Sequence, residues 1–323
     1  MIFSPQFIDR LHDSSFTQRL LREKAVVLDS TEFSYASACF TKWLYWGGVR
    51  RIAKAGQTPL IFGAAVHKGL AANLLGCSLL ESLAAVRTQA VVDNLDSYFD
   101  PLRTTDRALE ITEAYIHHCK IQPSERIVPV ELNGVKMVEQ NFCLPLGEVE
   151  TTLGMITVMW GGVIDVIDYD SNVLWVTDHK TTTVMGPKFV DDKIRSNQVL
   201  GYVWAARQLA ASLTRPVEGA KINALAHRAS GYEFKSFKIP VPQWKIEEWK
   251  SETLNRIREH VNKLAEMFTE HVIVDPNREG CVTKYGRCPF FDLCESPTIM
   301  RERTIFDNSF YMDNVWNPTG VEM

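Results

Sequence analysis

Two aspartates and a lysine lie close together in the stretch GGVIDVIDYDSNVLWVTDHKTTT, residues 161–183. Asp165 follows one apolar run, and Asp178 and Lys180 end the next, so two paired strands with a turn at 170–172 would bring both carboxylates to one site. Clustered carboxylates repel each other unless a cation neutralises them. Mg²⁺ or Mn²⁺ suits such oxygen ligands, and either ion can polarise a phosphoryl oxygen and lower the pKa of bound water. Lys180 shares a strand face with Asp178 and could orient the attacking water or stabilise charge on the phosphate.

Alone, this pattern is also compatible with strand-end residues that form surface ion pairs, because short motifs often occur by chance. His67, in the segment Gly63-Ala-Ala-Val-His67, is expected on a helix whose small residues allow close packing, and its imidazole could bind the metal. Glu139 alternates with apolar neighbours in KMVEQNF and could face the same cleft. Gln198 and Tyr202 are spaced i, i+4 on an expected helix, so they share a face that could contact a substrate. Each of these residues alone would be assigned to an ordinary surface or core position.

Taken in order, these residues resemble the RecB-like branch of the PD-(D/E)xK nucleases, which includes the nuclease domains of RecB and AddB and the CRISPR-associated adaptation nucleases. The pattern of that branch is a GxxxH helix, an upstream Glu, a G-x-I-D strand, a D-x-K strand and a Q-x3-Y helix. The resemblance extends over residues 34 to 295, and the matching positions are Gly63…His67, Glu139, Gly162-Val-Ile-Asp165, Asp178-His179-Lys180 and Gln198…Tyr202.

The resemblance implies a divalent-metal-dependent DNA nuclease that hydrolyses phosphodiester bonds, most simply an exonuclease acting on single strands or DNA ends. It makes the following groups metal ligands: His67, Asp165, Asp178 and the backbone carbonyl of His179. It also gives catalytic roles to Lys180, Asp178, Asp165 and Glu139, and substrate-binding roles to Gln198 and Tyr202. A Tyr is usual in the family where this chain has His179, but only the backbone carbonyl is needed there. Recombination or CRISPR proteins are the partners that the same analogy suggests.

The seven cysteines include a C-x6-C-x5-C array formed by Cys281, Cys288 and Cys294, whereas Cys39 lies far upstream. Thiolates at such spacing favour a soft metal centre, either zinc or an iron–sulfur cluster, and buried free thiols are the alternative. Many RecB-like nucleases hold a 4Fe–4S cluster with one cysteine before the first core helix and three near the C-terminus. The resemblance therefore implies a 4Fe–4S cluster on these four cysteines, with zinc as the alternative. The family's usual spacing after the first cysteine of the array is x2, so the x6 spacing enlarges this loop.

Hydrophobic periodicity and turn residues predict the elements that would position these groups. Helices are expected from about Ser34 to Leu44, around His67, over 79–121 with a break at 100–101, over 191–212 and over 243–268. Strands are expected within 127–144, 155–178 and 219–239, with turns at 133–134, 146–147 and 170–172. The predicted fold class is α/β (α+β), with a central mixed sheet flanked by helices. The resemblance adds that the core is restriction-endonuclease-like.

The predicted domain organisation is an N-terminal extension over 1–33, a nuclease domain over 34–311 and a C-terminal tail over 312–323. The nuclease domain contains a helical insert over about 69–126, and its iron–sulfur region comprises Cys39 and residues 281–294. We find no internal repeat and no low-complexity segment.

The composition is that of an ordinary globular protein, with 46% hydrophobic and 23% charged residues. The net charge of −4 provides no global basic field, so contacts to DNA must come from local patches and bound metal. The first residues lack a basic segment followed by an apolar one, and the uncharged stretches at 69–80 and 151–164 are too short to span a bilayer. We therefore expect a soluble cytoplasmic protein (in the host cytoplasm if phage-encoded) that contacts no membrane.

Two other function classes compete with the nuclease. A non-cleaving nucleic-acid-binding or assembly subunit with the same fold would have lost a catalytic residue, whereas His67, Asp165, Asp178 and Lys180 are all present. A zinc-ribbon DNA-binding protein would explain the C-terminal cysteines but leaves the G-x-I-D and D-x-K pair unexplained. The sequence therefore favours an active nuclease.

Overall fold

The computed structural model describes residues 4–53, 57–122, 125–170, 172–213, 215–269, 276–283 and 286–313 of the chain. Most of the predicted tail over 312–323 therefore lies outside the described residues. The chain divides into two units: unit 1 comprises residues 1–56, 142–162 and 247–323, and unit 2 comprises residues 57–141 and 163–246. All residues of the predicted carboxylate–lysine site belong to unit 2, and the four cysteines belong to unit 1.

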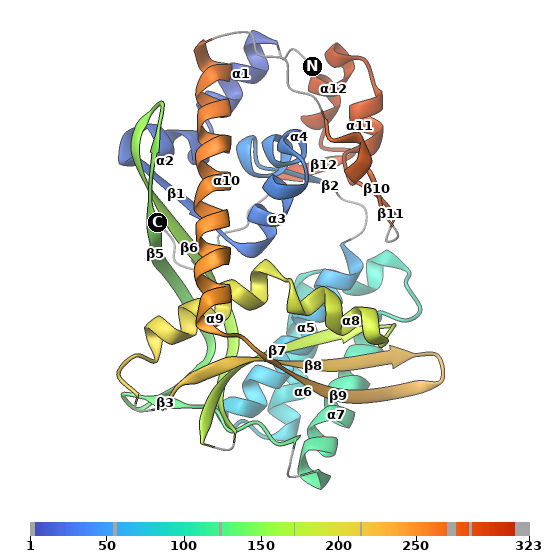
Figure 1. Ribbon diagram of the computed structural model, residues 1–323. Helices are drawn as coiled ribbons and strands as arrows, with labels where there is room; N and C mark the ends of the chain where they lie inside the picture. The colour runs from blue at the N-terminus through green and yellow to red at the C-terminus, as the bar shows by residue number, and fades with distance from the viewer. Residues whose placement is uncertain are drawn as a thin grey trace. The chain divides into compact units, whose positions relative to one another are not determined.

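Unit 2 is built on a mixed sheet with the strand order β6-β7-β8-β9 (Figure 1). The strands are β6 (Gly154–Asp170, in this unit from residue 163), β7 (Val173–Thr182), β8 (Val217–Arg228) and β9 (Gly231–Pro240). β7 runs antiparallel to β6 and parallel to β8, and β9 runs antiparallel to β8. Because parallel neighbours need a long crossover, the chain passes through α8 (Pro187–Ile194) and α9 (Asn197–Leu209) between β7 and β8.

Helices flank this sheet, as predicted (Figure 1). They are α5 (Thr58–Leu75), α6 (Leu79–Val92) and α7 (Thr105–Ile121), in addition to α8 and α9, with a 3₁₀ turn η2 (Leu95–Tyr98) before α7. Buried side chains of α5, α6 and α7 share one apolar cluster with Leu225 of β8. Burial of this shared surface holds α5, and with it His67, against the sheet. The predicted fold class is confirmed.

A short hairpin, β3 (Glu131–Leu132) and β4 (Val135–Lys136), follows α7. Its turn is the predicted Asn133-Gly134 pair, with φ values of 52° and 80° that this dipeptide tolerates. The next strand, β5 (Val138–Thr151), pairs with β6.

Unit 1 contains the N-terminal and C-terminal parts of the chain and the 142–162 portion of β5 and β6. Its N-terminal elements are α1 (Pro5–His12), α2 (Ser15–Glu23), β1 (Ala25–Leu28), α3 (Ser30–Ala38), α4 (Phe40–Trp43), the π-helical turn η1 (Leu44–Gly48) and β2 (Arg51–Ala53). Its C-terminal elements are most of α10 (Gln243–Thr269), η4 (Arg278–Gly280), β10 (Val282–Thr283), β11 (Gly286–Arg287), α11 (Phe291–Glu295), α12 (Thr298–Ile305) and β12 (Tyr311–Asp313). β1 lies parallel to β6 at residues 157–160, so the segment predicted as an N-terminal extension supplies a sheet strand.

Three predicted boundaries differ from the structure. The first helix begins at Ser30 because the Asp29 carboxylate accepts the Glu32 N–H at 2.7 Å and caps the helix, and it breaks at Cys39, whose backbone is extended. No turn interrupts β5 at 146–147, where the glycine instead makes room for Leu254 of α10. The helix expected over 191–212 is two helices, because Ser196 caps a new one.

Candidate active site

His67, Asp165 and the backbone of His179 form a connected group in unit 2. Nδ1 of His67 lies 3.4 Å from Oδ2 of Asp165, and Nε2 of the same ring lies 2.7 Å from the carbonyl oxygen of His179. The His179 N–H donates a hydrogen bond to Asp165 Oδ2 at 2.8 Å. The group draws on α5, β6 and β7, so three elements separated in sequence bring an imidazole, a carboxylate and a peptide together.

Glu139 joins this group from β5. One ligand atom each from Glu139, His67 and Asp165 all lie within 4.8 Å of one another. The backbone of Glu139 has φ 49°, a left-handed conformation that costs about 1–3 kcal/mol for a residue with a side chain. Lys68, beside His67 on α5, lies 3.2 Å from the Glu139 carboxylate and partly neutralises it.

Asp178 and Lys180 form an ion pair on β7, with Nζ 2.8 Å from Oδ1. Burial alone would lower the pKa of Lys180, but Asp178 and Asp165 outweigh burial and raise it, so the ammonium stays charged. Burial raises the pKa of Asp178, and Lys180 only partly opposes this effect. The second oxygen, Oδ2, is buried and has no hydrogen-bond partner within the described residues.

The two aspartates differ in charge preference. Burial alone would raise the pKa of Asp165, but the neighbouring His67 and Lys180 hold it well below its usual range. The same contact with Asp165 raises the pKa of His67 against the effect of burial. The surroundings of Asp165 therefore favour its charged form, whereas burial disfavours the charged form of Asp178.

A hard divalent cation fits this set of donors. Carboxylate oxygens, a backbone carbonyl and one imidazole nitrogen are ligands that Mg²⁺ and Mn²⁺ accept. The unpartnered Oδ2 of Asp178 is the kind of buried atom that a cation would satisfy. Asp178 is not part of the group whose atoms lie within 4.8 Å of one another, so the described side chains bring His67, Glu139 and Asp165 together more closely than Asp178.

Gln198 and Tyr202 lie on α9, half-buried and buried respectively. Their substrate-binding role stays a prediction. Lys193, at the end of α8, is a functional candidate that the sequence analysis missed. Burial lowers its pKa, and the charges of Lys180 and Asp178 act on it as well, so a second cation lies near the D-x-K pair. No spacing rule in the sequence connects α8 to β7, and only the fold shows this proximity.

A second buried charge cluster, behind the candidate site, was also missed. Lys221 of β8 forms an ion pair with Asp168 of β6, and the Thr177 hydroxyl donates to the same carboxylate at 2.6 Å. Lys221 is 6% exposed and Asp168 is completely buried. Side chains alternate along β6, so Asp168 lies on the opposite face from Asp165, and its partner lies 53 residues away in the chain.

The four cysteines gather in unit 1. The Asn277 N–H donates to Cys39 Sγ at 3.4 Å, and the Cys281 thiol donates to the Asn277 carbonyl at 3.4 Å. The Cys288 N–H donates to the Cys281 carbonyl at 2.8 Å. Burial, together with the other three cysteines, raises the pKa of Cys294 to about 12. The array and Cys39 therefore lie near one another, although some 240 residues separate them in the chain.

These thiols could hold a soft metal centre. Burial and the neighbouring cysteines raise the pKa of Cys281 as well as that of Cys294, so these two thiols are costly to ionise unless a cationic centre binds them. Lys42 lies near three of them: burial lowers its pKa, and Cys288, Cys39 and Cys281 oppose that effect. Its ammonium sits 3.7 Å from the centre of the Tyr35 ring.

Comparison with known proteins identifies the superfamily of the chain. Residues 31–295 match the family model of the PD-(D/E)XK nuclease superfamily. The chain therefore belongs to this superfamily of nucleases, whose members use divalent metals. No curated protein sequence resembles the chain closely enough to count as a relative.

Two solved structures resemble the chain at low identity. A crystal structure of a predicted exonuclease from Eubacterium rectale is 12% identical, with a TM-score of 0.47, over 94% of this chain and 98% of the other. The protein SSO0001 is also 12% identical, with a TM-score of 0.24, over 61% of this chain and 85% of the other. Backbones this different support no assignment of function to the chain.

Among the described helices, none combines the length and the apolar character that crossing a bilayer requires.

Proposed function

We propose that this protein is a divalent-metal-dependent DNA nuclease, and that it acts as an exonuclease on single strands or DNA ends. The observation that carries the proposal is the convergence of His67, Glu139 and Asp165 beside the peptide of His179. A structural ion-pair network would not need an imidazole, two carboxylates and a backbone carbonyl at one point. A cation site in a nuclease fold does.

When bound, a divalent ion supplies Lewis-acid chemistry to the scissile phosphate and the attacking water. Asp165 and Asp178 would hold it, together with His67 and the His179 carbonyl. Lys180 keeps its proton because two carboxylates surround it, so it can donate hydrogen bonds to a phosphate oxygen or to the water. Glu139 could add a further carboxylate ligand or orient the water, and Lys68 beside it could contact the next phosphate.

Local positive charge would bind the DNA backbone despite the net charge of −4. Lys68, Lys180 and Lys193 all lie near the candidate ligands. Gln198 and Tyr202, on the neighbouring helix α9, would contact the strand next to the scissile bond.

The test is digestion of end-labelled DNA with Mn²⁺ by the wild type, Lys180→Ala and Lys235→Ala. We expect Lys180→Ala to slow cleavage by about 10²–10³-fold, because it removes a preorganised charge from the phosphate. Among the described residues Lys235 forms an ion pair only with surface Glu233 on β9, so Lys235→Ala is the matched control and should cleave normally. Undiminished cleavage by Lys180→Ala would refute the assigned site. Wild type that binds DNA without cutting it would support a non-cleaving subunit instead.

The preference for ends is tested separately with linear and covalently closed single-stranded circles of equal sequence. An exonuclease degrades only the linear form. Cleavage of the circles at a comparable rate would make the protein an endonuclease.

We further propose that Cys39, Cys281, Cys288 and Cys294 hold a 4Fe–4S cluster. The four thiols lie near one another in unit 1, and the resemblance to RecB-like nucleases favours an iron–sulfur cluster over zinc. Protein purified without oxygen should contain about four iron atoms per chain and absorb visible light. Stoichiometric zinc without iron would overturn this proposal.

A further inference from the structure

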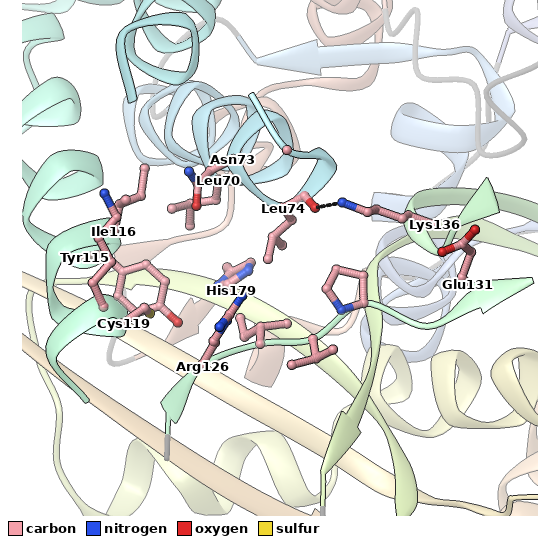
Figure 2. A pocket seen from close by; sticks show the side chains of 15 residues that line it. Leu70, Asn73, Leu74, Tyr115, Ile116, Cys119, Arg126, Glu131, Lys136 and His179 are labelled. Atoms are coloured by element: carbon pink, nitrogen blue, oxygen red, sulfur yellow. Dashed lines mark hydrogen bonds between the residues drawn. The ribbon is translucent and has the colours of Figure 1, made fainter. Parts of the chain in front are cut away.

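A cavity of about 700 Å³ opens in unit 2 between α5, α7 and the segment 126–136 (Figure 2). Its walls are mainly apolar and include Leu70, Leu74, Ile116, Ile127, Val128 and Pro129. Asn73, Tyr115 and Cys119 add polar atoms to the lining. A cavity of this volume and composition is typical of small-molecule sites, which run from about 300 to 1,000 Å³.

The side chain of His179 reaches this cavity from β7. Side chains alternate along a strand, so its ring points away from the face of Asp178 and Lys180. The residue is only 3% exposed, and neither ring nitrogen has a hydrogen-bond partner within the described residues. The Tyr115 ring meets it edge to face at 5.8 Å (Figure 2). The two rings together form an aromatic part of the cavity wall.

The rings of Tyr115 and His179 and the apolar side chains of the walls offer surroundings that suit a flat nucleobase better than an anion.

The mouth of the cavity carries positive charge. Lys120 and Arg126 line it, are exposed, and form no ion pair within the described residues. Lys136 also lines it and donates to the Leu74 carbonyl at 3.0 Å (Figure 2). Against these three cations stands one lining carboxylate, Glu131. Two unpaired cations at the mouth favour a phosphate group there.

We propose that this cavity binds a nucleoside monophosphate, with the base between the apolar walls and the His179 ring and the phosphate at Arg126 and Lys120. The inference rests on the proposed function in one respect, that a nuclease produces such nucleotides. A nucleoside monophosphate occurs both as the free product of cleavage and as the terminal nucleotide of a DNA strand. His179 connects the cavity to the candidate active site, because its peptide contacts Asp165 and His67 while its ring lines the cavity.

The test is calorimetric titration of the full chain, without divalent ions, with the four deoxynucleoside monophosphates, deoxyadenosine, inorganic phosphate and a 5′-phosphorylated hexanucleotide. We expect at least one monophosphate to bind with a dissociation constant below 1 mM, a generous limit of about −4 kcal/mol. Arg126→Ala should weaken this binding at least tenfold by removing the phosphate partner. Asn73→Trp should abolish it by filling the cavity from α5. Arg87→Ala, a charge loss on the exposed face of α6 away from the cavity, is the control and should bind normally.

Because the titration needs no cleavage, its outcome is independent of the digest described above. Tighter binding of the hexanucleotide that is lost in Asn73→Trp assigns the cavity to a strand end, and binding of the monophosphates alone assigns it to the free product. Either result supports the proposal. Equal binding of inorganic phosphate, or nucleotide binding that both variants retain, would overturn it. Arg126 is exposed, so its replacement tests the proposal even if Asn73→Trp fails to fold.

Discussion

At the residue scale, Glu32 is a completely buried carboxyl group that forms no ion pair with any described residue. Its Oε1 accepts from the Trp43 indole N–H at 3.3 Å, and its Oε2 has no partner within the described residues. Burial raises its pKa from 4.5 to about 7, although the charge of Arg50 opposes this effect. The folded protein therefore keeps this group protonated at pH values where the unfolded chain releases the proton.

This difference makes stability depend on pH with a defined sign. The unfolded state binds fewer protons than the folded state between pH 4.5 and about 7, so the free energy of unfolding falls as pH rises through this range and then levels off. Glu32→Gln removes the titration. We expect its stability relative to the wild type to improve by up to about 3 kcal/mol between pH 4.5 and pH 8. Urea unfolding of both proteins at the two pH values measures this, and parallel pH dependences would contradict it.

At the element scale, α5 can carry His67 to the site only if it packs closely on α6 and α7. Gly69 permits this, because a methyl group there would overlap Val86 and would lie 2.9 Å from Thr112 Cγ2. We expect Gly69→Ala to destabilise the protein by about 1–3 kcal/mol, as overpacked cores do. The displacement of α5 should also reduce Mn²⁺-dependent cleavage.

Gly63, on the same helix, provides the matched control. A methyl group there would meet only Thr181 Oγ1, at 3.4 Å, and alanine favours the helix by up to about 1 kcal/mol. Thermal unfolding followed by circular dichroism should therefore give a lower midpoint for Gly69→Ala than for Gly63→Ala. Equal midpoints would show that α5 can move away from α6 and α7 to admit the methyl group of Gly69→Ala without loss of stability.

At the scale of the whole molecule, unit 1 is assembled from three separate stretches of chain. A metal centre on Cys39 and the 281–294 array would close a loop of some 240 residues. Like a disulfide, it would restrict the conformations of the unfolded chain and so stabilise the fold. We expect Cys288→Ser to lose the metal centre and about 2–5 kcal/mol of stability. Cys77→Ser, at an exposed cysteine in unit 2, should lose neither. Iron content and thermal unfolding under anaerobic conditions measure both, and a Cys288→Ser protein that retains its iron and its stability would contradict the assignment.

Much of the fold was predictable from local patterns. Alternation and the Asn133-Gly134 pair predicted the hairpin of β3 and β4, and the apolar spacing from Leu254 to Phe268 predicted α10. Boundaries were less predictable. The turn expected at Gly147 is absent because that glycine accommodates Leu254, and a glycine needed for packing has the same sequence signature as a glycine needed for a turn.

The sequence by itself determined the order and type of the site residues, because a D-x-K strand end and a GxxxH helix are local patterns with their own periodicity. Only the tertiary structure decided how they meet. The positive φ of Glu139, the approach of Lys193 to Lys180 and the ion pair of Asp168 with Lys221 depend on packing between elements far apart in the chain. The cavity beside the His179 ring also depends on packing between distant elements, since four separate segments of the chain line it. Such contacts arise from the burial of whole surfaces, and no short window of sequence carries that information.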